Sequence, residues 1–135
     1  MRKCRFPARI EEVDRVIRFI EEGLASIGCT IKNKLVICVA VEEIFVNIAH
    51  YAYPSKEGEA EIHFCYSEQS KTVRISFMDS GIPYNPLKKE DPDLTLSAED
   101  RKIGGLGIYM VKQSMDQVIY EYKEGKNKLT IIKKM

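Results

Sequence analysis

A chain of 135 residues with 44% apolar and 30% charged side chains has the size and composition of one globular domain, so we expect a single domain over residues 1–135. Its net charge of +1 gives no overall attraction to nucleic acid, and the lack of a membrane-spanning run or a signal-peptide core predicts a cytoplasmic protein. The four cysteines are widely spaced without a C-x-x-C pair, which predicts reduced thiols rather than a disulfide framework or a metal site.

Apolar spacing in the first part of the chain predicts a strand followed by two helices. Residues 2–6 are expected to form a short edge strand that ends at Pro7. Apolar residues then recur at three- and four-residue steps over residues 10–27, which is typical of an amphipathic helix ending near Gly28. A second helix is predicted over residues 33–51. Because its apolar residues cover nearly every face, we expect this helix to be buried on most sides.

The middle of the chain predicts a hairpin and then a long loop. Apolar residues alternate with polar ones over residues 62–66 and again over 73–77, and the turn Glu68-Gln69-Ser70 between them predicts an antiparallel pair. Residues 82–103 are polar, contain three prolines and show no period. A loop of this length is usually a lid or binding loop, or else disordered.

The last part of the chain predicts a helix over residues 105–115 and a closing hairpin. Its strands are expected over residues 118–123 and 129–133, joined across residues 124–127. Together these elements predict an α+β fold. We expect a two-layer sandwich in which helices cover one face of a mixed, mostly antiparallel sheet.

Glu43 and Asn47 are the first candidate site residues. They are four residues apart, so they lie on the same face of the second predicted helix, among apolar neighbours. Burying a carboxylate is unfavourable unless the charge is paired or hydrogen-bonded, so a half-buried one needs a partner or has a functional role. Beside ATP, Glu43 could act as a general base and the Asn47 amide oxygen could complete a Mg²⁺ shell. A surface pair at the helix edge, or a carboxylate paired with Arg or Lys, would give the same pattern.

Asp79 and Gly81 form the second candidate group, directly after a predicted strand. A glycine lets the backbone approach a flat ligand closely, and a carboxylate accepts a hydrogen bond from the adenine amino group. Guanine presents a carbonyl oxygen at that position, which a carboxylate repels, so the placement selects adenine. Asp-Ser-Gly is also ordinary turn chemistry, and that alternative stays open.

Gly104-Gly105-Leu106-Gly107 opens the last predicted helix. The free amides and the dipole of a first helical turn bind anions, and glycines remove side chains that would block phosphate oxygens. Arg101 and Lys102, just upstream, could reach a γ-phosphate, or could be solvated charges. A flexible junction would explain the glycines equally well, and the run is neither a P-loop nor a dinucleotide fingerprint.

Taken together, these motifs resemble the GHKL-type ATPases, the superfamily of gyrase, chaperones, histidine kinases and mismatch-repair proteins. Residues 40–53 are similar to its N-box, Met78-Asp79-Ser80-Gly81 to its first glycine box, and residues 104–108 to its second. Phe6-Pro7-Ala8-Arg9 and Ser114-Met115-Asp116 also fit the branch of free-standing anti-sigma-factor serine/threonine kinases. The resemblance covers almost the whole chain and implies a Bergerat-type ATPase fold with an ATP lid over residues 82–103.

The resemblance also implies a role for each matched residue. Glu43 would be the catalytic base, Asn47 the Mg²⁺ ligand, Asp79 the adenine contact and Gly81 the floor under the base. The remaining expected nucleotide contacts are Arg101, Lys102, Gly104, Gly105, Leu106, Gly107, Ile108 and Thr130. Members of this branch hold a sigma factor inactive and phosphorylate a serine on a small STAS-type antagonist protein, and many are homodimers.

One position departs from the family pattern. The branch often carries an arginine at or just before the start of the second glycine box, where it meets the γ-phosphate, and here Ile103 and Gly104 stand in its place. A regulator that binds ATP or ADP and a protein partner without transferring phosphate is therefore an alternative. A detached histidine-kinase catalytic domain is a third alternative. The missing dimerisation helix and phospho-acceptor histidine argue against it.

Overall fold

The computed structural model describes residues 1–88 and 106–135, with Leu106 described by its backbone alone. Its elements follow one another along the chain in this order: β1 (Arg2–Pro7), a 3₁₀ turn (Ile10–Glu12), α1 (Val13–Ser26), α2 (Ile31–Tyr51), β2 (Glu59–Ser67), β3 (Thr72–Asp79), a second 3₁₀ turn (Pro86–Lys88), α3 (Leu106–Ser114), β4 (Gln117–Lys123) and β5 (Lys126–Lys134). The predicted elements are all found. Among these residues no helix is both long enough and apolar enough to cross a membrane.

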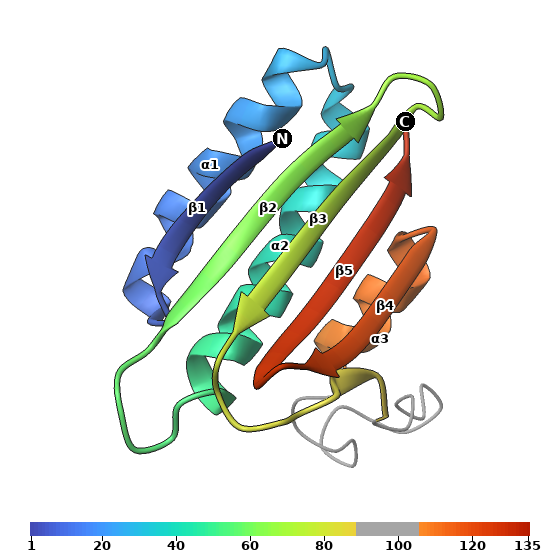
Figure 1. The fold of residues 1–135 in the computed structure, drawn as a ribbon. Helices are drawn as coiled ribbons and strands as arrows, with labels where there is room; N and C mark the ends of the chain where they lie inside the picture. The colour runs from blue at the N-terminus through green and yellow to red at the C-terminus, as the bar shows by residue number, and fades with distance from the viewer. Residues whose placement is uncertain (89–105) are drawn as a thin grey trace.

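The described strands form one five-stranded sheet in the order β1-β2-β3-β5-β4. Each pairing between neighbours is antiparallel, so the mixed sheet that the sequence suggested has no parallel pair among the described residues. Figure 1 shows the helices packed behind the sheet, and no described helix covers the opposite face of the sheet. The two-layer α+β sandwich is confirmed, and its core lies between the layers.

The core is made by one face of each inner strand and the inner faces of the helices. Ile62, Ile75 and Ile131 contribute from three adjacent strands, and Ile20 and Phe45 from α1 and α2; all of these side chains are fully buried. Alternation along each strand sends the intervening residues to the uncovered face. Two chemically distinct sheet faces result, and only the inner one adjoins the helices.

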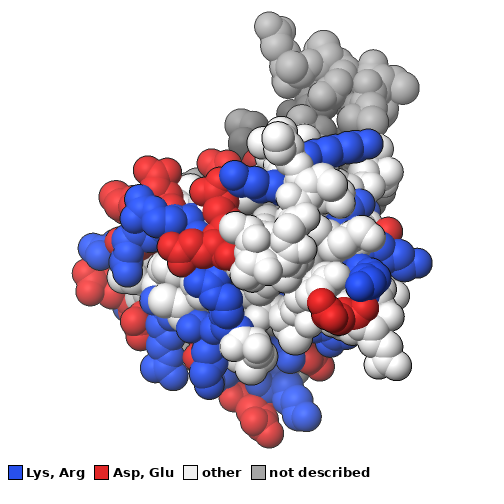
Figure 2. Space-filling model, turned by 90° about the horizontal axis from the view of Figure 1, so that it is seen from above, with Lys and Arg blue, Asp and Glu red and all other residues white. Residues whose placement is uncertain are grey.

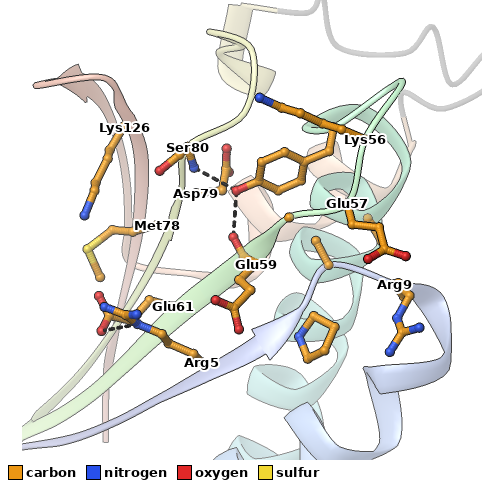
Figure 3. Close-up of a pocket in the computed structure, with 15 residues that line it drawn as sticks. Arg5, Arg9, Lys56, Glu57, Glu59, Glu61, Met78, Asp79, Ser80 and Lys126 are labelled. Atoms are coloured by element: carbon orange, nitrogen blue, oxygen red, sulfur yellow. Dashed lines mark hydrogen bonds and ion pairs between the residues drawn. The ribbon is translucent and has the colours of Figure 1, made fainter.

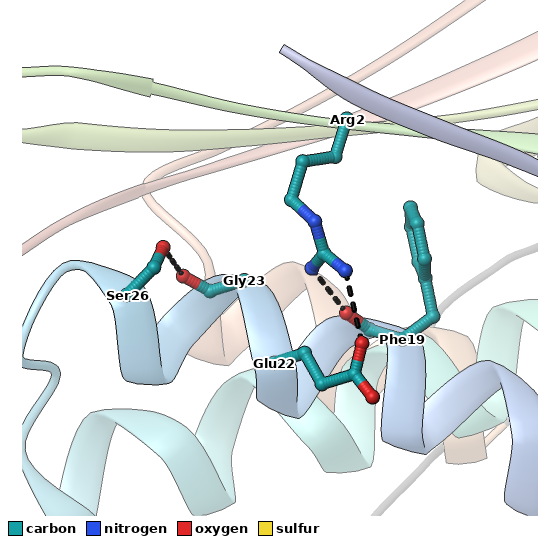
Figure 4. Close-up of polar contacts among 5 residues, drawn as sticks. All are labelled: Arg2, Phe19, Glu22, Gly23 and Ser26. Carbon is teal, nitrogen blue, oxygen red and sulfur yellow. Dashed lines mark hydrogen bonds and ion pairs between the residues drawn. The ribbon is translucent and has the colours of Figure 1, made fainter.

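The edge strand β1 is fastened to α1 through Arg2. Its guanidinium donates to the carbonyl oxygen of Phe19 (2.8 Å) and to the Glu22 carboxylate (3.0 Å), as Figure 4 shows. Gly23, on the same helix, allows a close approach to the sheet, since a Cβ there would lie 2.9 Å from the ring of Phe64. These contacts fix α1 against the β1–β2 edge of the sheet.

Helix α2 begins with a side-chain cap and is less buried than expected. The Thr30 hydroxyl accepts a hydrogen bond from the N–H of Asn33 (3.2 Å), which starts the helix at Ile31 rather than at residue 33. The prediction that α2 is buried on most sides is wrong, because Leu35 and Val39 are 60% and 45% exposed. The sheet, α1 and α3 cover the other sides of α2, and α3 leaves Leu35 and Val39 exposed.

Candidate functional site

Asp79 ends β3 on the inner face of the sheet, at the edge of the helix layer. Asp79 is buried, with 7% of the residue exposed. Its Oδ1 accepts two hydrogen bonds, from the N–H of Gly81 and from Nδ2 of Asn127, both at 2.9 Å. Among the described residues, the bonds that Asp79 accepts end on this one oxygen. The carboxylate is therefore held in one orientation.

Asn127 is the centre of this hydrogen-bond network, and sequence reasoning did not single it out. It lies opposite Asp79 in the β3–β5 register, and its Nδ2 also donates to the carbonyl oxygen of Ile82 (2.9 Å). Its Oδ1 accepts from the N–H of Tyr84 (3.1 Å) and from the Tyr120 hydroxyl. Burial, and more weakly the Asp79 charge, raise the pKa of Tyr120, which keeps this hydroxyl protonated as a donor.

A mostly apolar cavity lies directly beside Asp79, between α2 and the sheet. Asp79, Asn127 and Asn47 line it with polar side chains, and Tyr51 and Tyr84 line it as well. The apolar part is formed by α2, by the sheet and by α3, with Ile44, Ile48, Ala52, Phe77, Ile82, Ile108 and Leu129 among the lining residues. Apolar walls with a few fixed polar groups are the usual form of a small-molecule site. The chemistry of this lining suits an apolar group that presents a hydrogen-bond donor to a carboxylate.

Gly81 lies against the end of α2 and leaves no room for a side chain. A Cβ at this position would lie 2.2 Å from the carbonyl oxygen of Ala52, a backbone atom that cannot move aside. The next residue, Ile82, donates its N–H to the same oxygen at 3.0 Å. The glycine thus lets the chain after β3 bond directly to the end of α2, which closes one side of the cavity.

Glu43 and Asn47 lie half-buried on one face of α2, at successive helical turns. Asn47 lines the cavity, and Glu43 lies further toward the start of the helix. Gly107, in the first turn of α3, is in close contact with Glu43, since a Cβ on Gly107 would lie 2.1 Å from Glu43 Oε2. The first and third sequence motifs therefore meet, and the absence of a side chain at residue 107 makes this possible.

The structure places some of the remaining expected site residues at the cavity, and others lie outside the residues that it describes. Ile108 lines the cavity and is buried. Leu106 begins α3, while Arg101, Lys102, Gly104 and Gly105 lie outside the described residues, as does most of the expected lid over residues 82–103. The structure brings together Glu43, Asn47, Asp79, Gly81, Gly107 and Ile108.

Thr130 is not brought to the cavity. It lies between Leu129 and Ile131, which point into the core, so alternation places its side chain on the opposite, uncovered face of the sheet. There its hydroxyl is 3.0 Å from that of Ser76, the residue opposite it on β3. The residue of β5 that faces Asp79 is Asn127 rather than Thr130.

A second hollow, which Asp79 also lines, lies beside the end of β3 (Figure 3). There the Tyr53 hydroxyl donates to the carbonyl oxygen of Glu59 (2.7 Å) and accepts from the N–H of Ser80 (2.9 Å). The Tyr53 ring occupies the space where a Cβ of Gly58 would stand, 2.3 Å away. Burial raises the pKa of Tyr53, so the hydroxyl stays protonated. The charged side chains around it carry both signs: Arg5, Arg9, Lys56, Lys126, Glu57, Glu59 and Glu61.

Comparisons with known proteins agree with this arrangement. Residues 6–133 match the family described as the histidine kinase-like ATPase domain. The chain is 26% identical to the serine/threonine-protein kinase BtrW of Bordetella bronchiseptica over 73% of this chain and 68% of that protein. It is 27% identical to the serine-protein kinase RsbW of Bacillus thuringiensis over 91% of this chain and 78% of that protein.

Two further matches cover smaller parts of the known proteins. The chain is 31% identical to RsbW of Listeria monocytogenes over 64% of this chain, but the match spans only 57% of that protein. Among solved structures, the RsbU and RsbW domains of Rv1364c from Mycobacterium tuberculosis match with a TM-score of 0.66 at 16% identity. That match covers 99% of this chain and 32% of the other. At this identity the likeness shows the fold.

Proposed function

This chain belongs to the histidine kinase-like ATPase domain family, and from that premise we propose that it is an ATP-dependent serine/threonine protein kinase of the anti-sigma-factor type. The observation that supports this most is the meeting of Glu43 with Gly107, one helical turn from the cavity that Asp79 closes. Glu43 is half-buried, and its carboxylate lies against the first turn of α3. It suits a base at the phosphate end of a nucleotide.

The cavity beside Asp79 would hold the adenine ring. Apolar side chains from α2 and the sheet would cover the faces of the ring, and Asp79 would accept a hydrogen bond from its amino group. Because Gly81 and Asn127 already occupy Oδ1, Oδ2 is the oxygen left for adenine. The base would be selected by the direction of this one hydrogen bond, since guanine offers an acceptor in that position.

Glu43 would accept the proton of the substrate hydroxyl. As this proton leaves, the hydroxyl oxygen bonds to the γ-phosphorus of ATP and the bond from that phosphorus to the β–γ bridging oxygen breaks, so ADP departs and a phosphoserine or phosphothreonine remains. Mg²⁺, held through the Asn47 amide oxygen, would neutralise phosphate charge. Gly104, Gly105 and Gly107 would leave room for the phosphates, and Arg101 or Lys102 would contact the terminal one.

The biological partners follow from the family branch. Several relatives are named serine- or serine/threonine-protein kinases, and we propose that this chain is likewise a protein kinase. From its resemblance to the anti-sigma-factor branch we further propose that it holds a sigma factor inactive and phosphorylates a small STAS-type antagonist protein. We place this activity in the cytoplasm and expect the chain to act as a homodimer. The second candidate, a regulator that binds nucleotide without transferring phosphate, is favoured by one observation: Ile103 stands where the branch often has an arginine.

Label transfer separates these two functions. The purified chain is incubated with [γ-³²P]ATP, Mg²⁺ and, one at a time, the single-domain STAS proteins of its source genome. The kinase proposal expects label on a serine or threonine of one of them, reduced about 10²- to 10⁴-fold by Glu43→Ala while ATP binding by calorimetry is retained. Glu42→Ala is the matched control, because this exposed neighbour points about 100° away around α2. ATP binding without label on any partner would overturn the kinase and support the regulator.

A further inference from the structure

Helix α2 carries an exposed apolar stripe in its first half. Ile31, Leu35 and Val39 are 78%, 60% and 45% exposed. They follow one another at four-residue steps, so they lie along a single face of the helix. A single exposed apolar residue is ordinary, but aligned large apolar side chains on one face usually mark an interaction surface.

Leu35 and Val39 of this stripe help to line a groove between α2 and α3. Leu35, Val36, Val39 and Ala40 line it from α2, and Met110, Val111 and Ser114 line it from α3. Met110 is itself 47% exposed. Among the described residues that line the groove there is no Lys or Arg, and apolar side chains predominate. Figure 2, which looks onto the end of the molecule where α2 begins, shows an uncharged area bordered by interspersed charges of both signs.

The groove ends at Glu43. This carboxylate lines it, and the four-residue steps of the stripe continue through Glu43 to Asn47. From Leu35, the first residue of α2 in the groove, to Glu43 the helix rises by about 12 Å, which is the length of a little over two turns of a second helix. An apolar segment lying in the groove would therefore reach the proposed catalytic base at one end.

We propose that this α2–α3 groove docks an amphipathic helix of the protein substrate, with the hydroxyl to be phosphorylated just beyond the end of that helix at Glu43. The proposal rests on the kinase function above and names where its substrate binds. Grooves between helices commonly take the apolar face of a partner helix. A second copy of this chain is the less suitable occupant, because a copy seated here would block the access of any hydroxyl to Glu43.

The test uses polar substitutions that preserve the helices. Leu35→Gln combined with Val39→Gln changes two exposed side chains on α2, and Met110→Gln changes the opposite wall; none of them is in the nucleotide cavity. The matched control is Ile119→Thr, which removes a side chain of similar exposure (46%) from the uncovered face of the sheet. The probes are the single-domain STAS proteins of the source genome, with label transfer and calorimetric binding measured for each.

We expect the groove variants to raise the KM or Kd for the partner at least about tenfold, as loss of central apolar contacts does at other interfaces. The Kd for ATP should stay within about twofold of the original, and the control should change neither value. An unchanged partner KM with persisting label transfer would overturn the docking site and leave the kinase standing. So would a change confined to the oligomeric state, which would make a second copy the occupant.

The failure of the kinase function gives a different result. Partner binding that depends on the groove, without label on any partner, would refute phosphotransfer and retain the docking surface. If no STAS protein either binds or is labelled, both proposals fall. Circular dichroism of each variant shows whether a lost interaction comes from lost folding.

Discussion

At Asp79 the candidate site is closed by hydrogen bonds, whereas at Glu43 it opens into an apolar groove. Asp79 is buried, and its Oδ1 is fixed by a backbone amide and by Asn127. Glu43 is half-buried and lies against Gly107, at a place where three turns of exposed apolar surface end. A ligand at the first end meets groups that are already in place, and a ligand at the second end can be large.

This difference separates nucleotide affinity from turnover. Preorganised groups at the Asp79 end would set how tightly the nucleotide binds, because little ordering remains to be done on binding. The Glu43 end would set the rate of transfer, since a base acts only when a hydroxyl is held next to it. Variants at the two ends should therefore change different measured quantities.

Asp79→Asn is expected to have the largest effect on affinity. An amide can still accept from Gly81 and Asn127 through its oxygen, but its NH₂ then meets the adenine amino group, donor against donor. We expect ATP binding to weaken by about 3 kcal/mol, roughly 150-fold, with the fold retained. Isothermal titration calorimetry measures the loss. Unchanged affinity would remove Asp79 from the adenine contact.

Gly107→Ala is expected to act on transfer rather than on folding. The added methyl group would displace the Glu43 carboxylate, which is the far end of a flexible side chain. The free energy of unfolding should therefore stay almost unchanged. Misplacing a base in this way should reduce phosphate transfer by roughly 10- to 100-fold. Rate assays and thermal denaturation measure the two quantities. The contrasting variant is Gly81→Ala, whose methyl meets the Ala52 carbonyl and should lower the melting temperature clearly.

Asn127→Ala should weaken the Asp79 end without changing the carboxylate itself. It removes the partner of Asp79 and leaves the Ile82 carbonyl and the Tyr84 amide short of a hydrogen bond. We expect a loss of about 1–3 kcal/mol in the free energy of unfolding and ATP binding about tenfold weaker. Denaturant unfolding and calorimetry check this, with exposed Lys126→Ala as the neighbouring control. Full affinity in a folded variant would show that Asp79 needs no support from β5.

Thr130→Val should change ATP affinity least, by less than about twofold. Its hydroxyl bonds to Ser76 on the uncovered face of the sheet, so only that bond, worth about 1 kcal/mol of stability, would be lost. Calorimetry on the folded variant is again the measurement. A tenfold loss of ATP affinity would show that Thr130 contacts the nucleotide after all.

The fold followed from periodicity, because alternation in the strands and three-to-four spacing in α1 are strong local signals. The β4–β5 turn was harder to predict from the sequence. Residues 124–127 looked like a four-residue turn, but Glu124 and Gly125 alone form it, with φ of 55° and 77°. A two-residue loop of this kind usually begins with Asn, Asp or Gly, and Glu124 gives no such signal. The strand therefore starts earlier than predicted, and Asn127 lies beside Asp79 instead of in a turn.

The exposure of α2 could not be read from its composition. A run of apolar residues such as Leu35 to Val41 fits a helix covered on every side, and it fits equally a helix that keeps one apolar face for a partner. Only the placement of α3, which covers part of that face and leaves Leu35 and Val39 exposed, distinguishes the two. The face of Thr130 was similarly hidden, since it depends on strand register rather than on local sequence.

Gly58 shows how a residue outside the cavity can constrain evolution of the site. Any side chain there would push the Tyr53 ring away from Ser80 and Glu59, and so loosen the segment that carries Asp79. Substitutions at residue 58 should therefore weaken nucleotide binding more than they disturb the fold. Residues 53 and 58 should behave as an epistatic pair, in which a smaller side chain at 53 makes a larger one at 58 tolerable.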